Sequence, residues 1–576
     1  MPNPSDPAAT ASEIPTPDGS AGTGDGSGGA AAAAGNPVAR RIADGYATSA
    51  PCVTLGSVVV DGVADPGALV RIPLAMFNRH GLVAGATGTG KTKTLQGIAE
   101  QLSAAGVPVL MPDIKGDLSG LHAPGTGGAA ITARAADTGD QWTAQAFPVE
   151  FLSLAGQGGG VQLRATVDSF GPILLSKVLG LNETQESTLG LIFHWCDQQH
   201  LPLLDIKDLR EVIGYLTGDE GKAELKKLGG VSTATAGVIL RAVTNLAAQG
   251  GDRFFGEPEF DIADLMRTAP DGRAVINLLE VGDLQTRPAL FSTFLMWLLA
   301  ELFEHLPEVG DVDKPKLVFL FDEAHLLFDD ASKAFLDAIE QTVKLIRSKG
   351  VGVFFCSQLP TDVPGPVLSQ LGARIQHALR AFTPADQDAL ATTVKTYPVT
   401  EDYDLAKALT SLGIGEAIVT VLSEKGAPTP VAWTRMRAPR SLMDPIPDAD
   451  LAAAVAASPV AAKYGVAVDR QSAYEMLTAR LAQQQADADA AAREETGSPG
   501  DAGSYPGPDA GSSGPAGPAD NGGAGGVLTE IMGNTVVKSF MRSMASAIGG
   551  ALGRSIFGTR SRRSSSRRGG SSRRRR

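Results

Sequence analysis

Apolar and polar residues alternate regularly in the middle of the chain and show no such regularity at its two ends. From about Pro37 to Pro445, short runs rich in Val, Leu, Ile and Phe alternate with stretches of helical periodicity, and Gly or Pro separates them. Such alternation predicts an α/β domain with a mostly parallel sheet. Residues 1–36 contain almost no large apolar groups. Because such a segment cannot offset the entropy of ordering, we expect a disordered, low-complexity tail there.

Three segments follow the domain. Residues 446–495 predict a helical appendage, because Tyr474, Leu477 and Leu481 recur at helical spacing. Residues 496–526 have the composition of a Gly/Pro/Ser linker, and residues 527–576 join an apolar, cation-bearing stretch to an Arg-rich end. We expect the appendage to pack on the domain or on a neighbouring subunit.

A helical insertion is predicted inside the domain, at about residues 168–250. Four runs there have the apolar periodicity of helices, and together they exceed what a minimal nucleotide-binding core needs. His194, Cys196 and His200 lie in this region and could suggest a metal site. No further Cys is nearby in the sequence, so core packing is the favoured interpretation.

The first chemical motif is a glycine-rich loop between a strand and a helix. His80–Ala84 is a short apolar run, GATGTGKT follows, and the sequence from Lys91 has helical periodicity. This is the context of a P-loop, in which backbone N–H groups and the helix N-terminus bind phosphate. Lys91 is expected to bind the β- and γ-phosphates, and Thr92 to ligate Mg²⁺. The candidate nucleotide-binding residues are Gly85, Ala86, Thr87, Gly88, Thr89, Gly90, Lys91 and Thr92.

A second motif supplies two carboxylates. Lys316–His325 reads KLVFLFDEAH, an apolar strand that ends in Asp322 and Glu323. The carboxyl edge of a parallel sheet is where ligands bind. Asp322 is therefore expected to hold Mg²⁺, and Glu323 to act as the base that orients and activates the attacking water.

Two further strands are expected to end at the same edge. The strand Val107–Leu110 brings Asp113 and Lys115 toward the ATP neighbourhood, and GVGVFFCSQ ends in Gln358, which could sense a γ-phosphate or position water. An arginine finger supplied across a subunit interface would stabilise charge in the transition state. The candidate cations for this role, none of them singled out by pattern alone, are Arg347, Lys349, Arg374 and Arg380.

Charge is distributed unevenly along the 576 residues. The net charge is −13, but residues 527–576 carry twelve Lys and Arg against the single acid Glu530. Residues 1–526 therefore have 38 cations and 62 acids, a net charge of −24. The basic tail is typical of segments that bind phosphates. Two interpretations remain for it: a solvated tail that binds polyanions without specificity, or a tether for nucleic acid.

The cysteines and the hydropathy of the chain indicate where in the cell the protein is located. Cys52, Cys196 and Cys356 are far apart in the sequence, which favours a reducing cytoplasm over a disulfide framework. The most apolar stretch, Ala289–Ala300, is too short for a membrane span and precedes Glu301. We expect a cytoplasmic protein without an integral membrane segment.

Several motifs in fixed order resemble one family. The chain is similar to the HerA-like branch of the FtsK/HerA ATPases, and in particular to the YjgR-like family of bacterial helicase HerA-like proteins. The resemblance runs from about Val53 to Ala438. It is carried by GATGTGKT, DIKGDLSG, RATVDSFGPILLSKVLGLNETQ, GDRFFGEPEFDIADLM, FDEAHLLF, LIRSKGVGVFFCSQLPTDVP and LGARIQHALRAFTPAD.

The resemblance implies a RecA-like P-loop NTPase core, ATP and Mg²⁺ as cofactors, a homohexameric ring and movement on double-stranded DNA. It assigns Lys91 and Thr92 to the nucleotide loop, Asp322 and Glu323 to the metal and the water, and Gln358 to the sensor. Arg347 is the first choice for a finger that acts in trans. Two departures concern DNA: Pro37–Arg79 leaves room for only a small β-element, and the body is acidic.

Other classes of function remain open. The chain could be a protein-pumping or assembly ATPase related to secretion and conjugation motors, or a nucleotide-gated binding module without significant turnover. The letters DEAH also occur in a class of RNA helicases. The sequence lacks a second RecA-like lobe and the QxxGRxGR motif of that class, which disfavours it.

Overall fold

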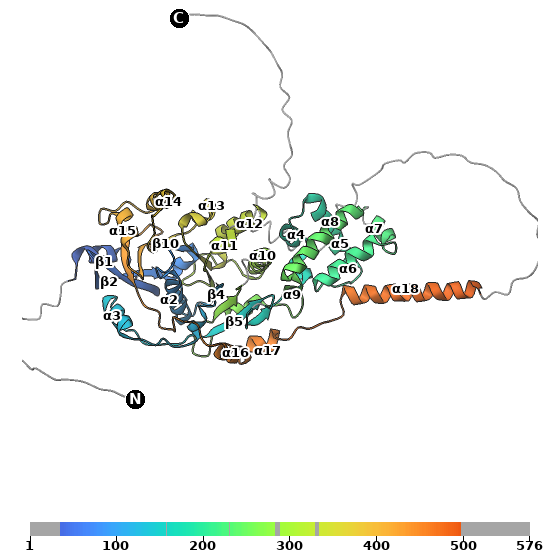
Figure 1. Ribbon diagram of the computed structural model, residues 1–576, viewed down its shortest axis with the longest axis horizontal. Coiled ribbons are helices and arrows are strands. Elements are labelled where there is room, and N and C mark those ends of the chain that lie inside the picture. The colour runs from blue at the N-terminus through green and yellow to red at the C-terminus, as the bar shows by residue number, and fades with distance from the viewer. Residues whose placement is uncertain are drawn as a thin grey trace, which may run out of the picture.

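A single twelve-stranded sheet organises the molecule (Figure 1). The computed structural model describes residues 35–496, except residues 157, 228, 230, 283–287 and 329–332. The strand order is β2-β1-β12-β11-β10-β3-β9-β8-β4-β7-β5-β6. The expected tail before residue 35, and the linker and basic segment after residue 496, lie outside the described residues.

Eight neighbouring strands of this sheet run parallel to one another. Apolar runs such as LVFLF form them because both faces of a parallel sheet are covered. This confirms the predicted α/β class with a mostly parallel, RecA-like sheet. The strands are β10 (Ala373–Gln376), β3 (Gly81–Ala84), β9 (Val351–Ser357), β8 (Leu317–Phe321), β4 (Val109–Asp113), β7 (Ile276–Glu280), β5 (Val149–Leu154) and β6 (Val161–Leu163).

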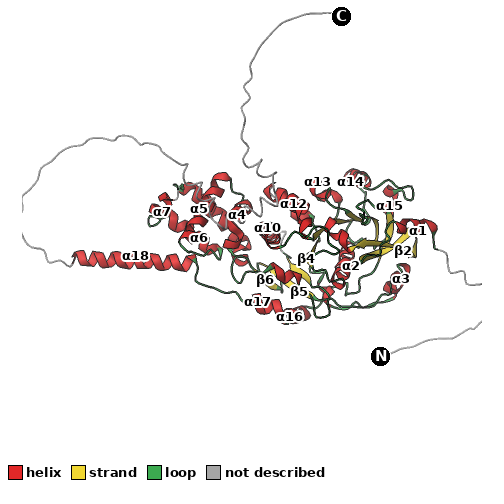
Figure 2. Cartoon of the chain, turned by 180° about the vertical axis from the view of Figure 1, so that it is seen from behind, coloured by secondary structure: helices red, strands yellow, loops and turns green. Residues whose placement is uncertain are grey.

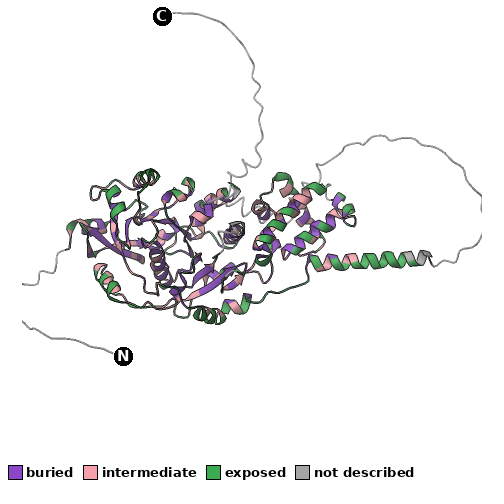
Figure 3. Cartoon of the chain, viewed as in Figure 1, coloured by how far each residue is buried: buried purple, intermediate pink, exposed green. Residues whose placement is uncertain are grey.

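Alternate residues of the central strands face two different cores. In β8, Leu317 and Phe319 belong to one apolar cluster, whereas Val318 and Leu320 belong to the other. Helix α2 (Lys91–Ala104) covers the second face. Helices α10 (Pro288–His305) and α12 (Lys333–Leu345) cover the first. Figure 3 shows the resulting layer of buried strands.

Four antiparallel strands extend the sheet beyond β10. They are β11 (Glu416–Thr420), β12 (Ala432–Met436), β1 (Cys52–Val60) and β2 (Val63–Pro73). The segment expected to form a small β-element is thus helix α1 (Pro37–Asp44) followed by a hairpin that joins the main sheet.

A group of helices lies at the opposite end of the sheet, beyond β5 and β6 (Figures 1 and 2). Side-chain caps start three of them: Asn182 accepts from Gln185 N, Asp205 from Lys207 N and Asp208 N, and Ser232 from Thr235 N. The helices are α4 (Val167–Val178), α5 (Glu183–Gln198), α6 (Ile206–Thr217), α7 (Lys222–Lys227), α8 (Thr233–Leu246) and α9 (Asp252–Phe254).

Three helices end the described chain: α16 (Asp448–Ala456), α17 (Pro459–Tyr464) and α18 (Ala473–Thr496). The start of α18 packs on α6, where Tyr474 N donates to Asp208 Oδ1 at 2.9 Å and Leu477 is fully buried. Most of α18 is exposed along its length (Figure 3).

The remaining helices are short. They are α3 (Ala129–Asp137), α11 (His325–Phe328), α13 (Gly365–Leu368), α14 (Pro384–Val394) and α15 (Leu405–Ser411). In the part of the chain that the structure describes, no helix combines the length and the apolar character that a membrane crossing requires.

Candidate functional site

The glycine-rich loop connects β3 to α2 in a conformation that only glycine adopts easily. Gly85, Gly88 and Gly90 have φ values of 151°, 79° and 108°, in the left-handed half of backbone space. A Cβ on Gly85 would lie 2.6 Å from Cβ of His377. The loop is therefore shaped by its glycines, with its backbone N–H groups at the N-terminus of α2 as phosphate binding requires.

Lys91 folds back over this loop. It is 7% exposed, and its Nζ donates to the carbonyl oxygen of Ala86 at 3.3 Å. The ammonium group thus lies at the mouth of the loop, where a β- or γ-phosphate would replace the carbonyl as its partner.

Thr92 and Asp322 meet across two elements. Thr92 Oγ1, in the first turn of α2, donates to Asp322 Oδ2 at the end of β8 over 3.1 Å. Asp322 is 8% exposed. A hydroxyl and a carboxylate oxygen at this separation are suitable ligands for one Mg²⁺ ion.

Glu323 is held in an uncommon backbone conformation. Its φ is 47°, which is rare for a residue with a side chain. Two hydrogen bonds fix the turn: Glu323 N donates to Asp322 Oδ1 at 2.8 Å, and Ala324 N donates to Cys356 O at 2.6 Å. The turn gives the two neighbouring carboxylates different partners: Asp322 meets Thr92, and Glu323 meets Lys115.

Each carboxylate oxygen of Glu323 has a different environment. Oε1 accepts a hydrogen bond from Lys115 Nζ. Oε2 is buried without a hydrogen-bond partner in the described chain, and His325 Nδ1 lies 3.5 Å from it. Burial alone would raise the pKa of Glu323, but the hydrogen bond and charge of Lys115 lower it on balance. Glu323 is therefore kept ionised, as a base must be.

Lys115 is brought to the site by the loop that follows β4. Asp113 closes this loop, since Oδ1 accepts from Gly116 N at 2.7 Å and Oδ2 from Leu118 N at 3.0 Å. Burial raises the pKa of Asp113 to about 6. Both oxygens of Asp113 are engaged inside the loop, so its contact with a nucleotide stays a prediction.

Gln358 lies at the carboxyl end of β9, between the strands of the other two motifs. Gly85 N donates to the carbonyl oxygens of Ser357 and Gln358, each at 3.2 Å, so the Gln358 backbone contacts the glycine-rich loop. The Gln358 side chain is exposed. The sensor role stays a prediction, but the residue is next to the site.

Arg347 is not brought to the site within the chain. It precedes β9, at the end of that strand opposite to Gln358, and its guanidinium binds Asp311 Oδ1 at 3.0 Å. Of the other candidate cations, Arg380 approaches the loop, with Nη2 at 3.4 Å from Thr87 O.

Sequence reasoning missed His377. This residue follows β10, is fully buried beneath the loop, and its Nε2 lies 3.0 Å from Thr94 Oγ1 in α2. Burial lowers the pKa of His377 to about 4. A polar residue at the carboxyl end of an apolar strand, as in ARIQH, was the available signal.

The region of His194, Cys196 and His200 contains no metal cluster among the described residues. Cys196 is buried in the helical core, whereas His200 is exposed. This agrees with the packing interpretation for Cys196.

A nucleoside triphosphate with Mg²⁺ fits the residues at this edge of the sheet. The loop and Lys91 and Thr92 follow β3 and begin α2, whereas Asp322 and Glu323 follow β8, which is separated from β3 by the single strand β9. Their arrangement defines the class: the protein is a P-loop nucleotide-binding ATPase.

The chain belongs to the family described as "Helicase HerA-like C-terminal", which matches residues 60–565. This confirms the resemblance seen in the sequence. No curated protein matches the sequence.

The solved structures that are similar to this chain include TrwB and VirB4. The bacterial conjugative coupling protein TrwB, in a form with sulphate, is 16% identical, covers 70% of this chain and 93% of its own, and has a TM-score of 0.45. TrwB with ADP and Mg²⁺ is 15% identical over 70% and 94%, with a TM-score of 0.44. VirB4 of Thermoanaerobacter pseudethanolicus is 16% identical over 68% and 98%, with a TM-score of 0.41.

Proposed function

We propose that the protein hydrolyses ATP with Mg²⁺ as a ring-shaped motor that moves on double-stranded DNA. The observation that carries the hydrolytic part is the meeting of Thr92, Asp322 and Glu323. The hydroxyl of Thr92 and the carboxylate of Asp322 are in contact, as two ligands of one metal would be, and the neighbouring carboxylate of Glu323 is kept ionised.

Each residue of the site has a separate role in the proposed hydrolysis. The loop N–H groups and Lys91 bind and orient the phosphates, while Thr92 and Asp322 would hold the metal. A Mg²⁺ ion held there would neutralise negative charge on the phosphates. Glu323, with one oxygen free of hydrogen bonds, accepts a hydrogen bond from the attacking water and takes up its proton.

A homohexameric ring is proposed from the family and from the position of Arg347. Arg347 lies at the edge of the sheet opposite to its own P-loop, and 38% of its side chain is exposed. It could complete the site of a neighbouring copy if that copy's P-loop edge faced it. Arg380, with Nη2 at 3.4 Å from Thr87 O, is the candidate for a cation that acts in its own subunit.

Double-stranded DNA is proposed as the substrate because the family description names a helicase. The twelve cations of residues 527–576 offer a sequence-independent contact with phosphates. The three free cysteines, two of them buried, support a place in the reducing cytoplasm.

The net charge of −24 on residues 1–526 favours a second candidate, a motor that moves protein. The deciding experiment measures ATP hydrolysis by the full chain, with its oligomeric state determined by light scattering, with and without double-stranded DNA. We expect hexamers and DNA-stimulated hydrolysis that is lost in Lys91→Ala.

Lys395→Ala, in the exposed α14–α15 region, is the matched control and should behave like the wild type. Robust hydrolysis that no nucleic acid changes would reject the DNA substrate and leave the protein-moving motor. Tight ATP binding without turnover would reject the motor itself and favour a nucleotide-gated binding module.

A further inference from the structure

Glu323 and His325 contribute two buried atoms that have no hydrogen-bond partner. Among the described residues neither Glu323 Oε2 nor His325 Nδ1 is paired, and the two atoms lie 3.5 Å apart. An ordinary N–H···O hydrogen bond joins atoms about 2.7–3.2 Å apart. Because buried polar groups are nearly always paired, two unpaired atoms side by side indicate a third group that binds both.

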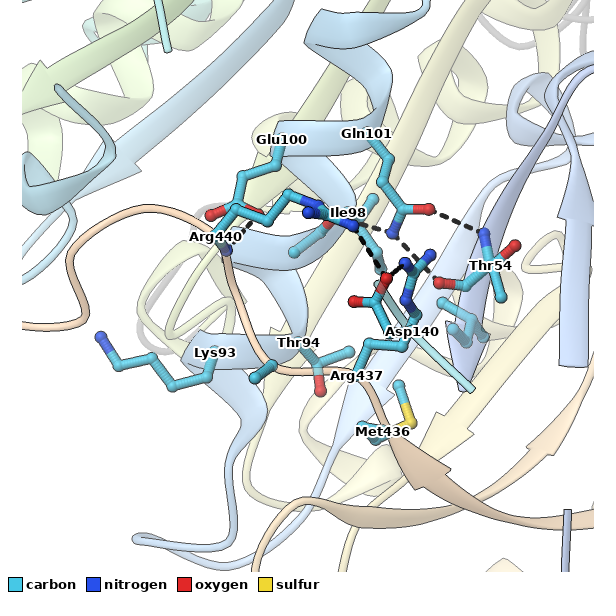
Figure 4. A pocket seen from close by; sticks show the side chains of 13 residues that line it. Thr54, Lys93, Thr94, Ile98, Glu100, Gln101, Asp140, Met436, Arg437 and Arg440 are labelled. Atoms are coloured by element: carbon cyan, nitrogen blue, oxygen red, sulfur yellow. Dashed lines mark hydrogen bonds and ion pairs between the residues drawn. The ribbon is translucent and has the colours of Figure 1, made fainter. Parts of the chain in front are cut away.

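The polar side chains of a nearby pocket are paired, unlike these two atoms. The pocket lies against α2 and is lined by no residue of the phosphate loop (Figure 4). There Gln101 Oε1 accepts from Thr54 N at 2.8 Å. Asp140 Oδ1 accepts from both Arg437 and Arg440, the latter at 2.8 Å. These groups need no ligand, whereas Oε2 and Nδ1 beside the metal-ligand candidates do.

Lys115 decides which oxygen of Glu323 is unpaired. Its Nζ donates to Oε1, so that Oε2 is the oxygen without a partner. Asp113 closes the loop that carries Lys115, where its Oδ1 accepts from Gly116 N at 2.7 Å. Anchoring one oxygen fixes the plane of the carboxylate, and Oε2 therefore keeps a defined position beside His325.

His325 is held by the short helix that it begins, α11. Leu326 N donates to Glu323 O at 3.0 Å, so the helix starts on the backbone of the base itself. At its other end, the ring of Phe328 packs on that of Phe355 in β9, with 5.5 Å between the centroids. The histidine and the base thus belong to one fixed turn.

The charges around Glu323 place its carboxylate beside the phosphate site. Burial would raise the pKa of Glu323, but Lys115 and, more weakly, Lys91 lower it. Lys91 is the residue expected to bind the β- and γ-phosphates. A water molecule bound to Oε2 would therefore be close to the phosphate that it attacks.

We propose that His325 is a further catalytic residue, which holds the attacking water together with Glu323. One water oxygen can lie about 2.8 Å from both Oε2 and Nδ1 when these are 3.5 Å apart. The water donates one hydrogen to Oε2 and the other to Nδ1, in the ring tautomer that carries its own hydrogen on Nε2. The inference rests on the proposed function and adds a second residue that orients the water.

His325 orients the water and does not take its proton. The water oxygen forms a bond to the γ-phosphorus, and the bond from that phosphorus to the bridging oxygen breaks, with its electron pair left on ADP. Glu323 Oε2 takes up one proton of the water. The other hydrogen, which pointed to Nδ1, stays on the inorganic phosphate.

The test keeps or removes an acceptor at the position of Nδ1. The amide oxygen of Asn can lie where Nδ1 lies in His, whereas that of Gln reaches the position of Nε2. In the full chain with Mg²⁺, we expect His325→Asn to retain kcat for ATP hydrolysis within about threefold of the wild type. His325→Gln and His325→Leu lower kcat about tenfold to a hundredfold and leave the Kd of a non-hydrolysable ATP analogue within about twofold.

His200→Asn is the matched control, because His200 is exposed and its φ of 55° is one that Asn also adopts. It should leave kcat and the Kd unchanged. Thermal melts establish which variants are folded, and His325→Gln replaces His325→Leu if the latter is not.

The inference is overturned if the folded variant without the acceptor hydrolyses ATP at the wild-type rate, or if it weakens binding of the analogue as much as it slows turnover. It is also overturned if His325→Asn is as slow as His325→Leu. Each of these results leaves the proposed function standing when Glu323→Gln is slow. A wild type without ATP hydrolysis, or a Glu323→Gln as fast as the wild type, would overturn the proposed function and the inference together.

Discussion

At the scale of residues, the site depends on a few residues whose backbone conformation is energetically unfavourable. Glu323 adopts a positive φ that costs a residue with a side chain about 1–2 kcal/mol. The hydrogen bond from Ala324 N to Cys356 O compensates, because it ties the turn after β8 to the carboxyl end of the neighbouring strand β9. Backbone strain of this kind clusters at functional sites.

His80 gives a residue-scale prediction on pH. It is 3% exposed, Nδ1 accepts from Val353 N at 3.1 Å, and Nε2 donates to Val343 O at 2.8 Å, so the neutral ring fits both partners. Burial lowers the pKa of His80 to about 4. The folded state therefore binds the proton less readily than the unfolded chain, whose histidine pKa is about 6.5.

A depressed histidine pKa contributes stability that is present above about pH 6.5 and is lost as pH falls toward 4. We expect the urea concentration at the unfolding midpoint to be lower at pH 5 than at pH 7. His80→Gln should be less stable at pH 7 but lose less stability on acidification. His200→Gln, at an exposed histidine, is the control. An unchanged pH slope in His80→Gln would contradict this account.

Some site residues could be read from the sequence and others could not. The P-loop, Asp322 and Glu323 were identifiable because each follows an apolar strand and matches a motif with a known chemical reason. The pairing of Lys115 with Glu323, and the position of His377 beneath Gly85, depend on which strands are neighbours. Strand order is a property of tertiary packing that no local pattern contains.

At the scale of elements, the parallel strands were predictable and the antiparallel extension was not. Continuous apolar runs such as VGVFFCS mark strands buried on both faces. The sequence left the region before the P-loop as an isolated small β-element. In the structure β1 pairs with β12, which lies almost 380 residues later in the chain. Such a long-range pair has no signal in local periodicity.

The contact between α6 and α18 gives an element-scale prediction. Asp208 Oδ2 accepts from Leu204 N at 2.8 Å and Asp205 N at 2.9 Å, while Oδ1 accepts from Tyr474 N. Asp208→Ala removes the acceptor of these three part-buried backbone donors. We expect a loss of about 1–3 kcal/mol in the free energy of unfolding.

The measurement is chemical denaturation followed by circular dichroism. Asp219→Ala, whose side chain is 99% exposed, should change stability by less than about 0.5 kcal/mol. Equal stability of the two variants would show that the α6–α18 contact is not formed in solution.

At the scale of the whole molecule, the separation of charge is the main feature. An acidic body of −24 repels the DNA that the proposed motor would move, whereas residues 527–576 attract it. We expect deletion after Gly526 to raise the DNA concentration needed for half-maximal stimulation while leaving hydrolysis without DNA unchanged.

Salt should separate a charge effect from a structural one. Stimulation of the full chain should weaken steeply as salt rises, because each phosphate contact releases counterions, and the deleted form should be less sensitive to salt. The control for the deletion is a full-length variant in which the twelve Lys and Arg of residues 527–576 are replaced by Gln. If this chain responds to DNA like the wild type, the tail does not bind DNA.

The proposed hydrolysis depends above all on Glu323, which activates the water that attacks ATP. The most direct measurement compares ATP binding and ATP hydrolysis in Glu323→Gln and the wild type, with Glu308→Gln at an exposed position as the control. We expect Glu323→Gln to bind ATP and to hydrolyse it about 10²–10⁴-fold more slowly than the wild type. Hydrolysis by Glu323→Gln at the wild-type rate would contradict it.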